Sequence, residues 1–206
     1  KMLGFSTEDV RGMFSYYKKV GMLPATCDIE AMIQDMKPWY DNYCFAKECL
    51  ESNIRVFNCD MVMYYLRNYV SRGQAPKVML DPNTKTDYNK LKGLIKLDKL
   101  DGDRKGMMLE IIEKGEIKAT LIPSFSAMEM TKPDIFPSLL FYYGMLTITG
   151  TRGSRVILGI PNNNVRKQYY NYILEVYDTL GNQVNILKLR DYFDMMAFDG
   201  NWRDCL

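Results

Sequence analysis

The sequence predicts a mainly α-helical protein with a small β component, in which a helical segment is followed by a winged-helix-like unit with a β-hairpin. Apolar residues recur at helical spacing over most of the chain. Capping residues and glycines delimit these stretches. Between residues 145 and 160, two short β-branched runs flank a glycine-containing loop directly behind an apolar helix. The first two observations predict the helices, and the third predicts the hairpin.

Capping residues and helix-ending residues delimit eight predicted helices. Ser6, with Asp9 three residues later, forms a capping box for the first helix. Pro38 is expected to end the second, because a proline disfavours a helical conformation in the residue before it. Asn58 or Asp60 caps the third. The predicted helices are residues 7–19, 29–37, about 59–72, 88–97, 104–114, 133–143, 164–180 and 186–198.

Three short strands complete the predicted fold. A run at 118–122 ends at Pro123, and the runs at 145–149 and 155–160 are rich in β-branched and apolar residues. The intervening stretch, 150–154, is expected to form the hairpin loop, with glycines where a positive φ is needed. The sheet is therefore expected to be small and to lie in the second half of the chain.

The most polar stretch, residues 98–106, is the best candidate for a domain boundary. We therefore predict a helical segment over 1–99 and a winged-helix-like unit over 100–181. Residues 182–206 are expected to form a helix and a linker toward a further domain. Predicted helix starts lie at or near both ends of the chain, so we expect it to be a segment of a longer protein.

Composition excludes several classes of function. No apolar run in the 206 residues approaches the roughly 20 needed to cross a bilayer, so no membrane partner is expected. The five cysteines are odd in number and irregularly spaced, which predicts free thiols in a reducing cytoplasm. Without histidine, the chain cannot build a Ser-His-Asp or Cys-His nucleophile. Cys44 and Cys49 lack the second ligand pair of a zinc site.

The remaining chemical patterns also give no catalytic site. The stretch 150–154 is glycine-rich, but it lacks the lysine of a phosphate-binding loop and lies between strands. Asp103, Glu116 and Lys118 match the letters of a metal-dependent nuclease site. The preferred interpretation is a capping Asp103 followed by a solvated strand. We therefore expect no catalytic residue, no metal site and no cofactor in this chain.

Nucleic-acid binding is the more plausible chemical role. Arg152 and Arg155 flank the predicted wing tip, and Arg166 and Lys167 begin the next helix. These four residues are our candidates for contacts to DNA phosphates. The alternative is that the wing packs on another domain. That alternative is favoured, because the predicted helix 133–143 is apolar and lacks the polar residues that read bases.

Six blocks of the chain, taken in order, resemble a bacterial family known as AAA-ATPase-like proteins. The blocks are 4–10, 39–45, 57–62, 81–88, 144–148 and 160–162. Members of this family join a P-loop ATPase region to a C-terminal PD-(D/E)XK nuclease-like domain. The commonest family form of the second block is WYDGYRF, where this chain has Asn42 for the glycine and Cys44 for the arginine. Asn42 tolerates a left-handed backbone, so the turn is expected to survive.

The resemblance implies that this chain is the middle of such a protein, with the P-loop before Lys1 and the nuclease-like domain after Leu206. Its expected role is a non-catalytic link between the two, and its expected partners are the other domains of the same polypeptide. ATP and Mg²⁺ would bind to the parent protein. Lys85 and Arg104 are the candidate basic residues near the γ-phosphate. The alternatives are a DNA-binding module and, less favoured, a free-standing metal-dependent nuclease.

Overall fold

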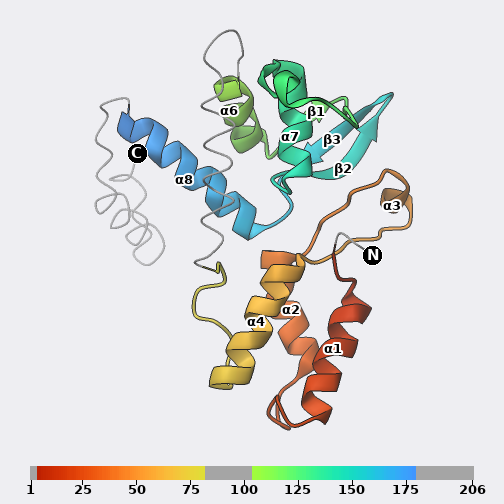
Figure 1. The fold of residues 1–206 in the computed structure, drawn as a ribbon, viewed down its shortest axis with the longest axis vertical. Helices are drawn as coiled ribbons and strands as arrows, with labels where there is room; N and C mark the ends of the chain where they lie inside the picture. The colour runs from red at the N-terminus through yellow and green to blue at the C-terminus, as the bar shows by residue number, and fades with distance from the viewer. Residues whose placement is uncertain (1–3, 82–103, 180–206) are drawn as a thin grey trace, which may run out of the picture. The chain divides into compact units, whose positions relative to one another are not determined.

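The computed structural model describes residues 4–81 and 104–179, and it is mainly helical with one three-stranded sheet (Figure 1). The predicted fold class is therefore confirmed. The described residues up to Gln168 form one compact unit, and a second unit begins at Tyr169. The predicted domain boundaries at 99/100 and 181/182 lie outside the described residues, as do the predicted helices 88–97 and 186–198.

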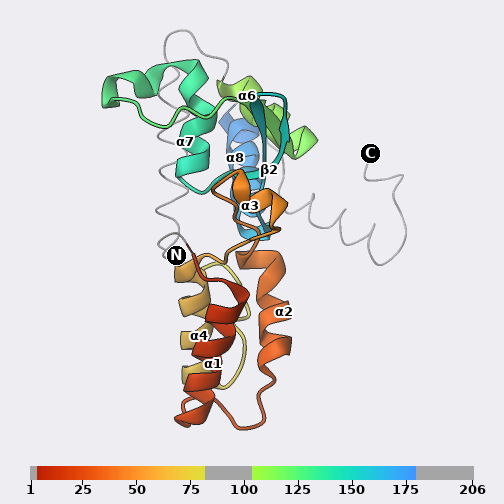
Figure 2. The same cartoon turned by 90° about the vertical axis from the view of Figure 1, so that its right-hand side faces the viewer.

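The first half of the described chain is a three-helix bundle of α1 (Thr7–Lys19), α2 (Ile29–Tyr40) and α4 (Cys59–Arg72). The helices lie side by side in both views (Figures 1 and 2). Each turns one apolar face inward, as amphipathic helices do when they share a core. The core residues are Val10, Phe14, Leu23, Met32, Ile33, Met36, Tyr40, Phe57, Met61, Val62, Tyr65 and Leu66.

Local capping chemistry confirms where α1 and α4 begin. The Asp9 N–H donates to Ser6 Oγ over 3.2 Å, and the Ser6 N–H donates to the Asp9 carboxylate over 2.9 Å. This is the predicted capping box. Asn58, the first of the two candidate caps, accepts from the Met61 N–H at the start of α4. The helix ends at Gly73, whose φ of 68° is left-handed.

The predicted end of the second helix is wrong, because α2 continues through Pro38 to Tyr40. A proline inside a helix removes one main-chain hydrogen bond, here the one to the Gln34 carbonyl. The helix keeps its last turn because the Asp41 N–H still donates to Lys37 O over 3.2 Å. Tyr40 is fully buried by this extension.

Two further differences lie in the bundle half of the chain. Val70 falls at the helical spacing of the apolar residues of α4, but it is 41% exposed because it lies in the last turn, beyond the core. The short helix α3 (Glu48–Glu51) was not predicted. Four residues without a side-chain cap give too weak a local signal to be found from sequence.

The second half contains α6 (Arg104–Lys114) and three strands, β1 (Glu116–Ala119), β2 (Thr147–Arg152) and β3 (Arg155–Gly159). Both pairings are antiparallel, in the order β1-β3-β2. The first strand begins two residues earlier than predicted, because Gly115, with a φ of 73°, turns the chain directly from α6 into the sheet.

The predicted five-residue hairpin loop is also wrong. Gly150 pairs with Ile157 beside a bulge, and Arg152 pairs with Arg155. The turn is therefore only the two residues 153–154, with Gly153 at a φ of 62°. Two-residue hairpin turns need positive φ, which glycine adopts without strain. Gly150 belongs to the strand and not to the loop.

The helix before the hairpin is shorter than predicted. Residues Pro133–Ile135 form a 3₁₀ turn, η3, and α7 covers Phe136–Tyr142. Another 3₁₀ turn, η2 (Ala127–Thr131), was not predicted. After the sheet, α8 covers Asn163–Thr179, close to the predicted 164–180. Over residues 4–81 and 104–179, no helix is both long and apolar enough to cross a membrane.

Asn42 gives the first testable prediction, because its φ of 78° is left-handed. Replacing it with glycine should leave the free energy of unfolding unchanged or slightly higher, whereas Asn42→Ala should lower it by about 1 kcal/mol. Urea denaturation of both variants measures the difference. The control pair is Gln34→Gly and Gln34→Ala on the exposed face of α2, where alanine should be the more stable by up to about 1 kcal/mol. The same order at both positions would contradict the prediction.

Candidate functional site

Four segments that are distant in sequence meet where the bundle adjoins the sheet. They are residues 39–45, 55–58, 144–148 and 160–164, and we call this meeting place the junction. Most main-chain groups at the junction lie outside regular helices and strands, so each of these must find another partner or lose stability. Their hydrogen bonds therefore show what holds the two halves of the unit together.

Two isolated β-bridges hold residues 55–58 to their neighbours at the junction. Val56 exchanges main-chain hydrogen bonds of 3.0 and 3.2 Å with Tyr43. Phe57 exchanges bonds of 2.7 and 3.1 Å with Phe5. The backbones approach so closely that a Cβ on Gly4 would lie 2.6 Å from Val56 Cγ2. Only glycine fits at that position without a shift of Val56 or Phe57.

The Thr147 side chain joins the start of β2 to the segment that follows α2. The Cys44 N–H donates to Thr147 Oγ1 over 2.6 Å. The Thr147 hydroxyl has two acceptors in reach, Cys44 O at 3.2 Å and Asn42 O at 3.3 Å. The Ile148 N–H also donates to Cys44 O. Thr147 is only 2% exposed, so water cannot replace these bonds.

Two asparagines each begin a helix and bind the end of α2. Asn162 donates from Nδ2 to Asp41 O over 3.1 Å, and its Oδ1 accepts from the Val165 N–H at the start of α8. Asn58 caps α4, and its own N–H donates to Tyr40 O over 2.8 Å. Asn162 is therefore the side chain that caps α8. The starts of α4 and α8 are thereby held at the same place.

Burial shifts the pKa of several ionisable groups at or beside the junction. Burial raises the pKa of the Asp41 carboxyl above its ordinary value, although the Asn42 N–H partly offsets this. Burial also raises the pKa of the Cys44 and Cys59 thiols. Both thiols therefore stay protonated near neutral pH and are poor nucleophiles. The junction thus offers hydrogen bonds, apolar surface and the partly buried carboxyl group of Asp41.

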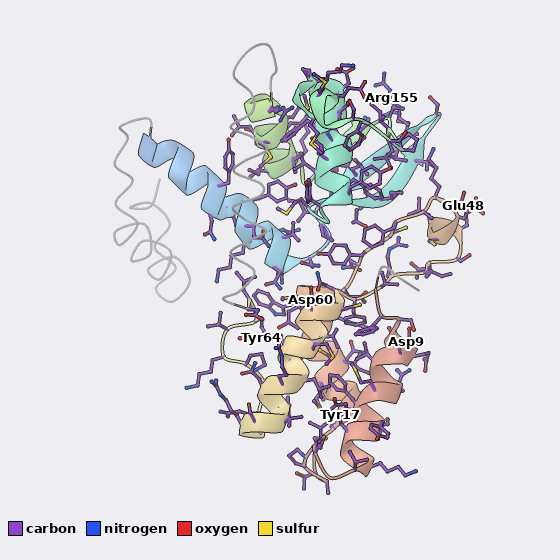
Figure 3. All side chains as sticks on the ribbon, viewed as in Figure 1. Asp9, Tyr17, Glu48, Asp60, Tyr64 and Arg155 are labelled. Carbon is purple, nitrogen blue, oxygen red and sulfur yellow. The ribbon has the colours of Figure 1, made fainter. Side chains whose placement is uncertain are left out.

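A cavity of about 340 Å³ opens at the junction. Its walls combine aromatic rings with the first turns of α4 and α8, and Figure 3 shows Asp60 on the first turn of α4. The lining residues are Trp39, Tyr43, Phe45, Asn58, Cys59, Asp60, Met61, Leu80, Tyr142, Tyr143, Gly144, Met145, Asn162, Asn164, Val165 and Gln168. Among these described residues there is no Lys or Arg, so the walls supply no cationic side chain.

Two buried amides in the cavity wall are unsatisfied. Asn164 is 4% exposed and Gln168 is 7% exposed. Among residues 4–81 and 104–179, neither Nδ2 nor Oδ1 of Asn164 has a hydrogen-bond partner, and neither does Oε1 of Gln168. Buried side-chain amides are normally paired, so each such atom requires an explanation. Sequence reasoning missed both residues, although three consecutive asparagines at 162–164 exceed the single one that a cap needs.

The two candidate nucleotide-proximal residues do not line this cavity. Arg104 is fully buried in the sheet half, where its Nη2 donates to Met130 O and its guanidinium lies 5.0 Å from the centre of the Phe136 ring. Lys85 lies outside the described residues. The structure therefore gives Arg104 a packing role and gives Lys85 no position.

The four candidate DNA-binding residues are all exposed. Arg152 and Arg155 face each other across the last pair of the β2–β3 hairpin, and Figure 3 shows Arg155 there. Arg166 and Lys167 lie on the first turns of α8. The hairpin thus brings the first two together at its tip, as the sequence predicted.

The residues that match a nuclease pattern do not form a site in the described chain. Glu116 and Lys118 both lie on the exposed face of β1, and Asp103 is outside the described residues.

The Cys44 thiol, one of the two cysteines considered for a zinc site, is buried and donates from Sγ to Ala46 O over 3.3 Å. Within residues 4–81 and 104–179, no three His, Cys, Asp or Glu side chains come together as metal ligands would.

Comparison with known proteins gives no match to a family model, to a curated protein or to a solved structure. The function of the junction must therefore be inferred from its own geometry. That geometry holds two parts of the chain together by hydrogen bonds and lines a cavity with aromatic rings and neutral amides.

Thr147 gives the second prediction. Thr147→Val keeps the side-chain shape but leaves the buried Cys44 N–H without its acceptor, so the free energy of unfolding should fall by about 1–3 kcal/mol. Thr149→Val is the matched control on the same strand, because Thr149 is exposed and its hydroxyl donates to Ile157 O over 3.3 Å at the surface. Equal losses for the two variants in urea denaturation would show that the Thr147 hydroxyl does not hold the junction.

Proposed function

We propose that this chain is a non-catalytic segment of a cytoplasmic AAA-ATPase-like protein, in which it couples an upstream ATP-binding core to a downstream nuclease-like domain. One observation supports this proposal above the others. Of the six blocks that carry the resemblance, five are joined by hydrogen bonds at or beside the junction. These are the blocks at 4–10, 39–45, 57–62, 144–148 and 160–162.

This convergence is what a coupling role requires. A segment that transmits a change between two domains must resist bending between them, because a flexible link would absorb the displacement. The junction joins the ends of α2, the start of α4, the start of β2 and the start of α8 through buried, directional bonds. These bonds oppose sliding of the bundle against the sheet, so the bundle and the sheet would move as one body.

In this proposal, ATP and Mg²⁺ bind to the parent protein's core and not to this segment. Lys85 remains the candidate basic residue near the γ-phosphate. Arg104 is the weaker candidate, because its guanidinium would first have to leave Met130 O and the face of Phe136. Alanine at Lys85 in the full-length protein should lower ATP turnover, and unchanged turnover would remove that assignment.

The test of the coupling proposal begins with the coding DNA on both sides of this segment. We expect a continuous reading frame with a G-x4-G-K-[ST] sequence upstream and an Asp…acid-x-Lys sequence downstream. In the full-length protein, Asn162→Ala should lower ATP turnover several-fold or uncouple it from the nuclease-like domain, while nucleotide binding stays unchanged. Asn163→Ala, next to it and outside the cavity wall, is the control. Start and stop codons bounding the segment would exclude the proposal.

A DNA-binding wing is the second candidate, and the exposed Arg152–Arg155 pair at the hairpin tip favours it. The order of elements supports this candidate: α7 precedes the β2–β3 hairpin, and β1 pairs with the free edge of β3, as expected for a winged helix. Residues Phe136–Phe141 of α7 are buried, however, so this face of the helix cannot read bases. Such a wing would contact phosphates without sequence preference.

The wing candidate predicts a change in salt dependence. If both arginines contact phosphates, Arg152→Ala/Arg155→Ala should weaken duplex binding and reduce the slope of log K against log salt concentration by about 2. Fluorescence anisotropy with a labelled duplex at several salt concentrations measures it. Lys19→Ala/Arg72→Ala removes two exposed charges from the bundle and is the matched control. Binding that is weak, insensitive to salt and equal in both variants would count against a DNA-binding wing.

A further inference from the structure

We propose that the junction cavity binds a nucleobase, with the amides of Asn164 and Gln168 on the polar edge of the base and aromatic side chains against its faces. The proposal is independent of the coupling role, because it rests only on the cavity and its walls. The same base chemistry occurs in a free nucleoside and in an unpaired strand of nucleic acid. The experiment below distinguishes these two sources.

The unsatisfied amides point to a ligand with an adjacent donor and acceptor. The carboxamide of Asn164 offers one donor group and one acceptor side by side, and both are unpaired among the described residues. This pair is complementary to the edge of a nucleobase, as in the bidentate contact of asparagine with adenine. Gln168, one helical turn further along α8, adds a second unpaired acceptor. A single water could satisfy part of this set, but it would leave the aromatic walls without a partner.

The aromatic walls provide the stacking surface. Tyr142 is 50% exposed and Tyr143 is 44% exposed, although both line the cavity. Tyr43 stacks on Phe45 with ring centres 5.7 Å apart and an interplanar angle of 11°. Bases stack on such rings with little regard to sequence, because every base has a π face. Trp39 completes the set of aromatic lining residues.

Size and charge limit the ligand further. A volume of about 340 Å³ is at the lower end of small-molecule pockets, which suits one base with its sugar. The described lining residues include the carboxylate of Asp60 and no Lys or Arg. A phosphate inside the cavity would therefore lack a cationic partner and would face a negative charge. The uncharged base is the part of the ligand that fits.

The experiment uses the 206-residue chain and titrates it with adenosine, guanosine, cytidine and uridine, and separately with short single strands that carry a normal or an abasic central position. Saturation-transfer NMR reports ligand contact, and isothermal titration gives Kd. Asn164→Leu and Gln168→Leu should each weaken binding about tenfold or more. Asn163→Leu, adjacent but outside the cavity wall, should leave Kd unchanged.

Both test variants are expected to fold, because leucine removes buried atoms without a partner, namely both polar atoms of Asn164 and the amide oxygen of Gln168. Thermal unfolding checks this. Binding of a nucleoside supports a free ligand. Binding only of a strand with its central base intact supports a base within nucleic acid. The proposal is overturned if neither binds. It is also overturned if binding is equally strong in Asn164→Leu, Gln168→Leu and the control, since the ring faces alone would then explain it.

Discussion

The hydrogen bonds between Thr147 and Cys44 determine how the sheet meets the bundle. The Cys44 N–H donates to Thr147 Oγ1 at the start of β2 over 2.6 Å, and the Ile148 N–H donates to the Cys44 carbonyl. Both polar groups of Cys44 are thus satisfied by consecutive residues of one strand. Because Thr147 is buried, these bonds fix the position of β2, and β3 and β1 then follow through their ladders. A one-residue shift of β2 would leave the Cys44 N–H without an acceptor and move Ile148 out of the core.

The same end of α2 also sets the starts of two other helices. Asn58 and Asn162 satisfy the first turns of α4 and α8, and both are tied to the carbonyls of residues 40 and 41. The extension of α2 through Pro38 is therefore part of the architecture, because a helix ending at Lys37 would not bring these carbonyls to the junction. The buried ring of Tyr40 offsets the hydrogen bond lost at the proline.

Features that depend on neighbours in sequence were predictable, and features that depend on distant partners were not. The Ser6–Asp9 capping box and the glycine ends of α4 and α6 are local, and the sequence predicts each. Pro38 predicts a helix end, because a local sequence pattern does not show that Tyr40 is buried and that the helix extends to it. Gly150 was predicted as a loop residue, because only its pairing with Ile157 places it in β2. The left-handed Asn42 was predicted from its tolerance of positive φ and from the glycine in the family's form.

The candidate site was missed because the search for chemistry followed charged and nucleophilic residues. Those residues do not form one site: Arg104 packs on Phe136, and Glu116 and Lys118 are exposed on β1. The unsatisfied side-chain atoms of the cavity wall belong to neutral amides, which are ordinary in a sequence and become informative only when their burial is known. A ligand held by Asn164 and Gln168 would touch the first turns of α4 and α8 at once. If the ligand binds more tightly when those turns lie together, it would stabilise that arrangement by the difference in binding free energy. In a coupling segment, occupancy of the cavity would therefore control how stiffly the bundle and the sheet are joined.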